Sequence, residues 1–228
     1  MMARDHAALA AVVALGLGRL AGLATPELLV VAATATGAAL LPDIDEPGST
    51  VAHLAEPVTG LVAHVTKRVA GGHRVGTHSL LAVVLAGLST WALGFVALGQ
   101  AGVPASVVPL GFCLALCIRG LIPRVFRPGH LVSLALAAGA TWWIWTHVGI
   151  GAWLPWAIAG GWAAHLGGDW LTNSGVPLFW PVSKRHFAWP ILDHTNSWRE
   201  WVIGLGLLAG TVALAWAPVA SFVATVRP

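Results

Sequence analysis

The sequence predicts an all-α membrane protein, a bundle of about seven helical segments with a metal site where several helix ends meet. Of its 228 residues, 57% are hydrophobic and only 9% are charged, whereas charged residues make up about a quarter of an ordinary soluble domain. No Asp, Glu, Lys or Arg occurs in 75–118, 128–168 or 201–226. One membrane-spanning helix needs roughly 20 apolar residues. The first two stretches therefore each predict a helical hairpin, and the third predicts a single span.

The first two helices are predicted at 7–24 and from Thr25 to about 41–42. The first is an Ala/Leu/Val segment interrupted by Arg19. A charged start followed by an apolar core is also typical of a signal peptide, which is the alternative for this segment. Thr25, Pro26 and Glu27 supply an N-cap, a first-turn proline and a first-turn acid for the second helix. Both helices are rich in Ala and Gly, which predicts tight packing inside a bundle.

The segment 43–77 is polar and is predicted to leave the bilayer. Within it, one helical face is apolar and is formed by Val58, Leu61, Val62, Val65 and Val69. This pattern predicts a helix lying in the membrane interface. His53 and His64 belong to this segment, and we expect both to be solvated or interfacial rather than metal ligands.

The remaining spans are predicted at 80–98, 105–118, 131–148, 153–171 and 201–223. Glycine-containing turns separate the members of each hairpin. Cys113 and Cys117 lie one helical turn apart in an apolar run, and we expect them to be packing residues outside any disulfide framework.

Alternation of the seven segments places the N-terminus and the loops 43–77, 119–130 and 172–200 on one face. All of the twelve Lys and Arg residues except Arg19 and Arg227 fall on that face, so the positive-inside rule makes it cytoplasmic. Tryptophans gather near both faces, as interfacial belts do. We predict one multi-pass domain of the inner (plasma) membrane over residues 1–228, with 42–77 and 172–200 as the cytoplasmic regions that form the site.

The same face receives an unusual set of imidazoles and carboxylates. They are His6, Asp43, Asp45, His73, His78, His165, Asp169, Asp193 and Glu200. Residues 165 and 169 are four apart and share a helix face. Carboxylates held close together raise one another's pKa unless a cation neutralises them. Neutral imidazole with carboxylate suits Zn²⁺, and also Mn²⁺ or Fe²⁺, so we expect one to three divalent transition-metal ions.

Taken singly, each of these residues has an ordinary explanation. A histidine at a helix end is usually hydrogen-bonded, and an aspartate after proline is usually a turn residue or a cap. Thr77 fits a helix N-cap as well as a neighbour of a ligand, and Arg74 is expected to support the site or face an anion. The metal-site interpretation depends on the placement of all these groups on one face.

Three ordered motifs also carry a family resemblance. They are L-L-P-D-I-D-E-P at 40–47, G-H-R-x-x-T-H-S-L-L at 72–81 and H-x-x-x-D-x-L-T-x-x-G-V-P-L-F-W-P at 165–181. From His6 to about Glu200 the chain resembles the YdjM family of inner-membrane metal-dependent hydrolases. That family is similar to the superfamily of zinc-dependent phospholipases C and single-strand nucleases. The chain departs from the pattern at Val75, where the family usually has glycine.

The resemblance implies a ligand set and a chemistry. The implied ligands are His6, Asp43, Asp45, His73, His78, His165 and Asp169, with Glu200 as a less closely matching acid. Beyond that ligand set, we expect Asp43, Asp45 and Asp169 to be the catalytic carboxylates and Arg74, Lys184 and Arg185 to contact a substrate phosphate. For these three cations, the positive-inside pattern or contact with lipid headgroups is the alternative.

The leading functional hypothesis is a membrane-embedded hydrolase that cleaves a phosphoester, of a lipid or lipid-linked substrate, with metal-activated water. A non-catalytic membrane adaptor with a structural metal site is one alternative. An ion transporter is another, although it predicts ionisable residues near mid-span, where this chain has only Ser and Thr. No H-E-x-x-H motif supports an intramembrane metalloprotease. Membrane lipid is the expected partner, and no nucleic acid is expected, because the basic residues form no stripe.

Overall fold

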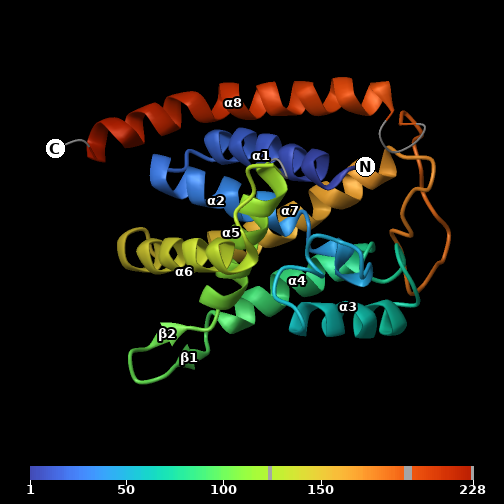
Figure 1. The fold of residues 1–228 in the computed structure, drawn as a ribbon, viewed down its shortest axis with the longest axis horizontal. Helices are drawn as coiled ribbons and strands as arrows, with labels where there is room; N and C mark the ends of the chain where they lie inside the picture. Colours follow the sequence, from blue (N-terminus) through green and yellow to red (C-terminus); the bar gives the residue numbers. More distant parts are fainter. Residues whose placement is uncertain (123–124, 193–196, 227–228) are drawn as a thin grey trace.

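A computed structural model describes residues 1–122, 125–192 and 197–226, which contain eight α-helices and one two-stranded hairpin (Figure 1). The helices are α1 (Ala3–Leu20), α2 (Thr25–Ala38), α3 (Val58–Val69), α4 (Leu80–Leu93), α5 (Val107–Leu121), α6 (His130–His147), α7 (Trp153–Trp170) and α8 (Trp198–Val226). A short 3-10 helix, η1 (Pro42–Asp45), follows α2. The helical class is therefore as predicted. The seven long apolar segments appear as helices, and α3 is the amphipathic helix expected between them.

Several predicted boundaries are wrong, and the first helix, α1, spans Ala3–Leu20 instead of 7–24. Helix α4 ends at Leu93 instead of residue 98, because the chain turns back through an antiparallel pair, β1 (Ala97–Leu98) and β2 (Val103–Pro104). Gly99 and Gly102 occupy positive φ in the connecting turn, which other residues rarely adopt. Helix α2 ends at Ala38, and a turn at 39–41 takes the place of its predicted last residues and leads into η1. Helix α8 begins at Trp198, before the predicted start at 201.

Close approach between helices is made possible by glycines, as the abundance of small residues predicts. Helix α7 packs against α1, α2 and α4, while α5 packs between α2 and α6. A Cβ on Gly37 in α2 would lie 1.7 Å from the Cys113 carbonyl oxygen of α5, and one on Gly161 in α7 would lie 2.3 Å from the Ala35 carbonyl oxygen. Only glycine allows backbones to come this near.

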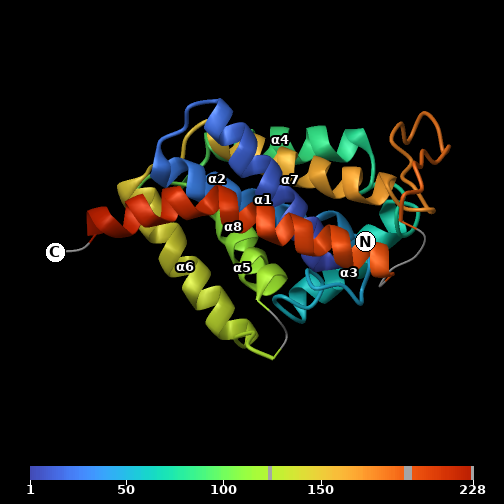
Figure 2. The same cartoon turned by 90° about the horizontal axis from the view of Figure 1, so that it is seen from above.

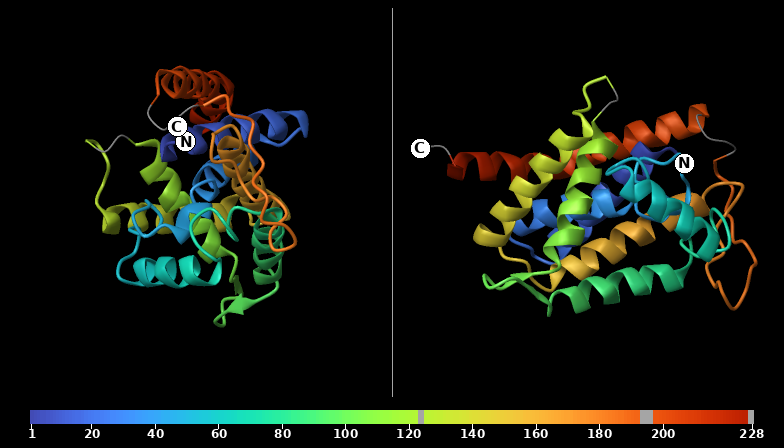
Figure 3. Two further views of the ribbon diagram at one scale, coloured as in Figure 1. Left: turned by 90° about the vertical axis from the view of Figure 1, so that its right-hand side faces the viewer. Right: turned by 60° about the horizontal axis from the view of Figure 1, so that its bottom comes forward.

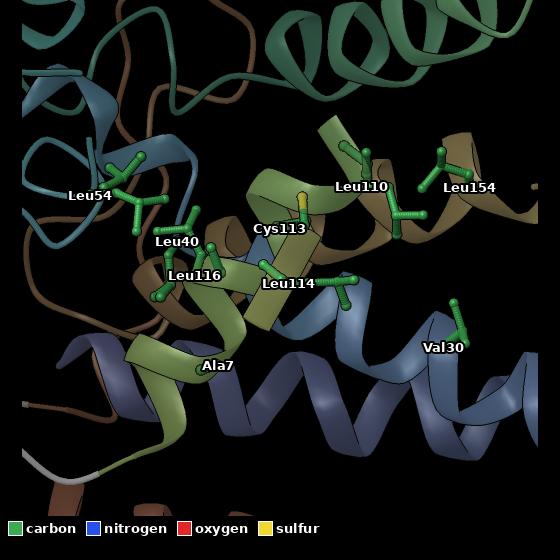
Figure 4. Close-up of a cluster of buried hydrophobic side chains, with 14 of the residues drawn as sticks. Ala7, Val30, Leu40, Leu54, Leu110, Cys113, Leu114, Leu116 and Leu154 are labelled. Atoms are coloured by element: carbon green, nitrogen blue, oxygen red, sulfur yellow. The ribbon is translucent and has the colours of Figure 1, made fainter. Parts of the chain in front are cut away.

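The apolar core lies where α2, α5 and α7 meet (Figure 4). Leu40, Leu110, Leu116 and Leu154 are almost fully buried there, together with the thiol of Cys113. Both cysteines are free, as expected of packing residues. This core packs the end of α2 against α5 and the first half of α7, and the segment directly after α2 carries candidate ligands.

The outer helices present large apolar side chains to the surroundings. Leu85 of α4, Trp142 of α6 and Leu205 of α8 are all more than half exposed. Helix α8 runs along the outside of the bundle, over α1 and α2 (Figures 1 and 2). Contiguous exposed apolar surface marks contact with a membrane or a partner. Two segments, Thr25–Asp45 and Trp198–Ala224, are long and apolar enough to cross a membrane, and the first of them is largely interior.

The polar segments gather at one end of the bundle. The N-terminus, the end of α7, the start of α8, helix α3 and the long loop after α7 all lie at the end opposite the last turns of α8 (Figures 1 and 3). Alternation of the helices along the chain therefore brings the three sequence motifs to the same place.

Candidate metal centre

The structure brings seven of the eight candidate ligands into one cluster. They come from the first turns of α1 (His6), from η1 (Asp43 and Asp45), from the loop before α4 (His73 and His78) and from the last turns of α7 (His165 and Asp169). Their potential ligand atoms form three overlapping groups, and within each group all atoms lie within 4.8 Å of one another. Asp43 and His73 retain 26% and 34% side-chain exposure, whereas the other five are buried.

His165 presents a lone pair to the centre of the cluster. Its Nδ1 lies 2.7 Å from the backbone carbonyl oxygen of Ala39. A carbonyl oxygen can only accept a hydrogen bond, so Nδ1 carries the proton and Nε2 is unprotonated in the neutral ring. This is the arrangement that commonly orients a metal-ligating imidazole.

His78 is oriented in the same way by a different partner. The Thr77 hydroxyl donates to Oδ2 of Asp45, so its oxygen accepts from Nδ1–H of His78 at 2.9 Å. Nε2 of His78 is therefore also unprotonated. Burial, together with the neighbouring His165, lowers the pKa of His78 despite the nearby carboxylates, which favours the neutral form that metals bind.

Four potential donor atoms converge around these two rings. The Nε2 atoms of His78 and His165 are 3.2 Å apart. Asp43 Oδ1 lies 3.7 Å from each nitrogen, and Asp169 Oδ2 lies 3.6 Å from each. Ligands about 2.0–2.1 Å from a tetrahedral zinc ion are about 3.3 Å from one another. The spacing of these donors thus fits a common divalent ion.

Asp169 is held so that one of its oxygens faces the histidine pair. Its Oδ1 accepts from the Arg74 guanidinium at 3.0 Å and faces the terminal amine of Met1 and Nε2 of His6 at 3.3 and 3.4 Å. Its Oδ2 is buried without a hydrogen-bond partner among the described residues. Leaving a buried acceptor unsatisfied costs about 1–3 kcal/mol, and a cation between Oδ2 and the imidazoles would remove that cost.

His6 reaches the cluster because α7 carries a glycine beside it. The His6 ring stacks on His165, with ring centroids 3.8 Å apart and an interplanar angle of 13°. A Cβ on Gly168 would lie 2.8 Å from Nδ1 of His6. That nitrogen is buried and has no hydrogen-bond partner among the described residues. The two glycines at 167 and 168 therefore have different surroundings, since nothing lies within 4 Å of a Cβ added at Gly167.

One of the three groups, formed by Asp43, Asp45 and His73, lies on the more exposed side of the cluster. His73 Nδ1 is 2.7 Å from Oδ1 of Asp45, and this hydrogen bond raises the pKa of His73 against the opposing effect of burial. Oδ2 of Asp45 accepts from the Arg74 amide at 3.1 Å as well as from Thr77. Because protein donors engage both of its oxygens, Asp45 orients the loop 73–78. The carboxylate of Asp43 belongs both to this group and to the group that contains His78 and His165.

Glycine is not required at Val75, the position where the chain departs from the family pattern. The left-handed backbone conformation occurs one residue earlier, at Arg74 with φ +58°. Its amide and guanidinium then bond to Asp45 and Asp169, respectively. The departure at Val75 thus leaves the spacing and orientation of His73 and His78 intact.

Three predicted site residues lie outside the cluster. Glu200 is buried, but it accepts from the Met2 amide at 2.6 Å at the start of α1 and belongs to none of the three groups. Lys184 and Arg185 are exposed on the loop after α7, where the Arg185 guanidinium lies over the Phe187 ring. Asp193, also placed on this face, lies outside the described residues.

Other contributors have weaker sequence signals. Asp5 is buried beside Glu200, and a Cβ on Gly204 of α8 would lie 2.5 Å from its Oδ1. The only feature of the sequence that pointed to Asp5 was its place as an acid in the first turn of an apolar helix. Trp162 donates from Nε1 to the Thr77 carbonyl oxygen at 2.8 Å. The Ala39 carbonyl that orients His165 has no side chain by which a sequence could mark it.

Together, the fold and the cluster define a class: a helical membrane protein with a buried histidine and carboxylate centre able to hold a divalent cation. The family model of the YdjM inner membrane proteins matches residues 1–122 and 128–226. The chain belongs to the YdjM inner membrane protein family. No match was found among curated proteins or among solved structures.

Proposed function

We propose that this protein is a multi-pass, metal-dependent hydrolase of the inner membrane, with its site at the cytoplasmic face and a phosphoester as its substrate. The observation that carries the proposal is the 3.2 Å separation of the Nε2 atoms of His78 and His165, which both present lone pairs in the neutral rings because their Nδ1 atoms face acceptors. Two carboxylate oxygens complete the donor set. Neutral imidazoles with carboxylates suit Zn²⁺ first, with Mn²⁺ or Fe²⁺ as alternatives.

The residues of the cluster divide into holding and orienting groups. His78, His165, Asp43 and Asp169 would hold the ion, and a bound divalent cation supplies Lewis acidity and acidifies coordinated water. The partial exposure of Asp43 leaves one side of the cluster open to a substrate. A fully closed structural site would have no such side, which favours catalysis over the adaptor alternative.

Cationic groups support an anionic substrate. Arg74 lies within the cluster at 23% side-chain exposure, and it could contact a phosphate oxygen while it remains bound to Asp169. Lys184 and Arg185 are exposed on the loop after α7, and we assign them to headgroup contact at the membrane surface. The gathering of basic residues at the site end of the bundle supports a cytoplasmic orientation.

Metal analysis of the purified chain tests the proposal. We expect one to three transition-metal ions per chain, and we expect His165→Ala and Asp43→Ala to lose metal while remaining folded in detergent. His64→Ala is the matched control, because the one hydrogen bond of this exposed ring among the described residues is with the Gly60 carbonyl oxygen of its own helix. Full metal content in His165→Ala and Asp43→Ala would contradict the ligand assignment.

A chromogenic soluble phosphodiester then tests the reaction itself. Hydrolysis that depends on added metal and disappears in His165→Ala would support the hydrolase. Metal binding without hydrolysis of any ester offered would instead favour a non-catalytic adaptor with a structural metal site.

A further inference from the structure

Arg119, in the last turn of α5, is a buried cation beside the turn that joins α5 to α6 (Figure 2). Only 8% of its surface is exposed. Its Nη1 donates to the Pro128 carbonyl oxygen at 3.3 Å, and its Nη2 lies 3.4 Å from Nε2 of His130. Among the described residues, Nε has no hydrogen-bond partner and no carboxylate pairs with the guanidinium. Buried charges normally have an opposite charge beside them, and this one lacks it.

The groups around Arg119 do not supply a negative charge. A guanidinium can only donate, so Nε2 of His130 accepts from it. Nδ1 of His130 then carries the proton and donates to the Leu54 carbonyl oxygen at 3.3 Å. Glu56, two residues beyond Leu54, is exposed and bonded to His53. The corner between α5 and α6 therefore keeps an uncompensated positive charge.

Helix α6 adds more positive charge to the same corner. It begins at His130, and its N-cap is Gly129, which has no side chain to accept a hydrogen bond from the first-turn amides. These free N–H groups and the helix dipole place partial positive charge at the start of the helix. The Arg119 guanidinium contacts residues 128 and 130, so it lies where a cation is unfavourable. Helix N-termini commonly bind phosphate and similar anions.

The exposed side chains of this corner are those of a surface at the membrane interface. Val125 and Phe126, in the loop, are 85% and 78% exposed, and Leu131, in the first turn of α6, is 82% exposed. Arg127, half-buried in the same loop, adds a second guanidinium. The topology predicted from the sequence places this loop on the cytoplasmic face, where lipid phosphate groups are abundant.

We propose that Arg119 and the first-turn amides of α6 form a binding site for a phosphate-type anion, separate from the metal centre. The anion would accept hydrogen bonds from the amides and from the second N–H of Nη1 and of Nη2. It would thereby neutralise the guanidinium and hold α5 and α6 together. Neither Arg119 nor His130 belongs to the three groups of candidate metal ligands, so the site does not depend on the proposed hydrolase. A lipid headgroup and inorganic phosphate both have the required chemistry.

Thermal unfolding of the full-length protein in detergent tests the proposal and distinguishes the two sources. One titration adds inorganic phosphate and another adds dihexanoyl phosphatidylglycerol, both at constant ionic strength, and dihexanoylglycerol is the control lipid without phosphate. We expect the unfolding temperature to rise with the anion and not with the control lipid. The probe that acts at the lower concentration identifies the source. No rise with either anion would overturn the proposal.

Gly129→Asp tests the site without removing a contact. Gly129 is exposed, its φ is −58°, and a Cβ added there would meet nothing within 4 Å. The new carboxylate would cap α6 and take the place of the anion beside Arg119. We expect a higher unfolding temperature without any added anion and loss of the response to it. Gly129→Asn is the matched neutral cap and should retain the response. Equal responses in the two variants would contradict an anion at this position.

Arg119→Gln removes the buried charge itself. We expect the apparent Kd for the anion to rise roughly 10–100-fold, the factor for loss of a hydrogen bond to a charged group. Arg68→Gln removes the same charge from an exposed position on α3 and should leave the Kd unchanged. If the two variants have the same Kd, the anion is attracted by overall charge and the site is wrong.

His165→Ala separates this inference from the proposed function. Phosphate could also bind to an ion at the metal centre, and this variant is expected to lack that ion. A response that persists in His165→Ala and is lost in Gly129→Asp would place the anion at α6. Loss of the response in His165→Ala would instead place it at the metal centre, which overturns the inference and leaves the hydrolase proposal intact.

Discussion

The Nε2 atoms of His78 and His165 lie 3.2 Å apart in the buried end of the bundle, and in the neutral rings neither can donate a hydrogen bond to the other. Each ring already donates from Nδ1, one to Thr77 and the other to the Ala39 carbonyl oxygen. Two lone pairs and two carboxylates facing one another repel unless a cation separates them. The stability of this end of the protein should therefore depend on a bound ion.

Chelation should lower the thermal stability of the purified protein. A ligand that binds only the folded state stabilises it by about 2.7 kcal/mol at a concentration of one hundred times its Kd. We expect the unfolding temperature in detergent to fall after treatment with a chelator and to recover when Zn²⁺ is added. His165→Ala should show neither change, and an equal response in this variant would mean that the metal binds elsewhere.

Gly168→Ala should displace His6 from the cluster. The added methyl would lie 2.8 Å from Nδ1 of His6, and the imidazole can move only by giving up its stacking on His165. We expect a folded protein whose metal affinity is roughly 10–100-fold lower, as for loss of a supporting group. Gly167→Ala is the control, because its methyl would meet nothing. Equal metal affinities in these two variants would show that the position of His6 does not affect metal binding.

Thr77→Val should weaken metal binding without removing a ligand. The hydroxyl connects Asp45 to His78 Nδ1 and fixes which nitrogen faces the cluster. Loss of such an orienting group typically costs 10–100-fold in metal affinity, which isothermal titration with Zn²⁺ would measure. Thr146→Val is the control, since this exposed hydroxyl lies at the end of α6 and donates to its own helix. An unchanged Kd for Thr77→Val would mean that His78 is oriented by other contacts.

Ser79→Ala should destabilise the start of α4. Ser79 is its N-cap, where the side-chain oxygen accepts from the Ala82 amide at 3.2 Å and the hydroxyl donates to the Gly76 carbonyl oxygen at 2.7 Å. Removal of such a cap costs about 1 kcal/mol. A lower unfolding temperature is expected relative to Ser89→Ala, which changes an exposed serine in the middle of the same helix. Equal unfolding temperatures would show that the cap contributes nothing measurable.

The sequence alone determined the helical class, the family and the set of polar groups at the site end. Long apolar runs, Pro and Gly at segment ends, and the spacing of His165 and Asp169 are local features, so composition and periodicity reveal them. The end of α4 was predicted too late because hydrophobicity continues through Phe95 and Val96, whereas the turn at 99–102 is set by two glycines in positive φ.

Only the tertiary structure decided which groups meet and which atoms they present. Glu200 and Asp169 lie on the same face in the sequence-based topology. Helix packing nevertheless places Glu200 against the Met2 amide and Asp169 against the imidazoles. The orientation of His165 depends on a carbonyl oxygen 126 positions away along the chain. Such contacts depend on interhelical distances of a few ångströms, which are set by close packing at residues such as Gly161 and Gly168, and no local pattern encodes them.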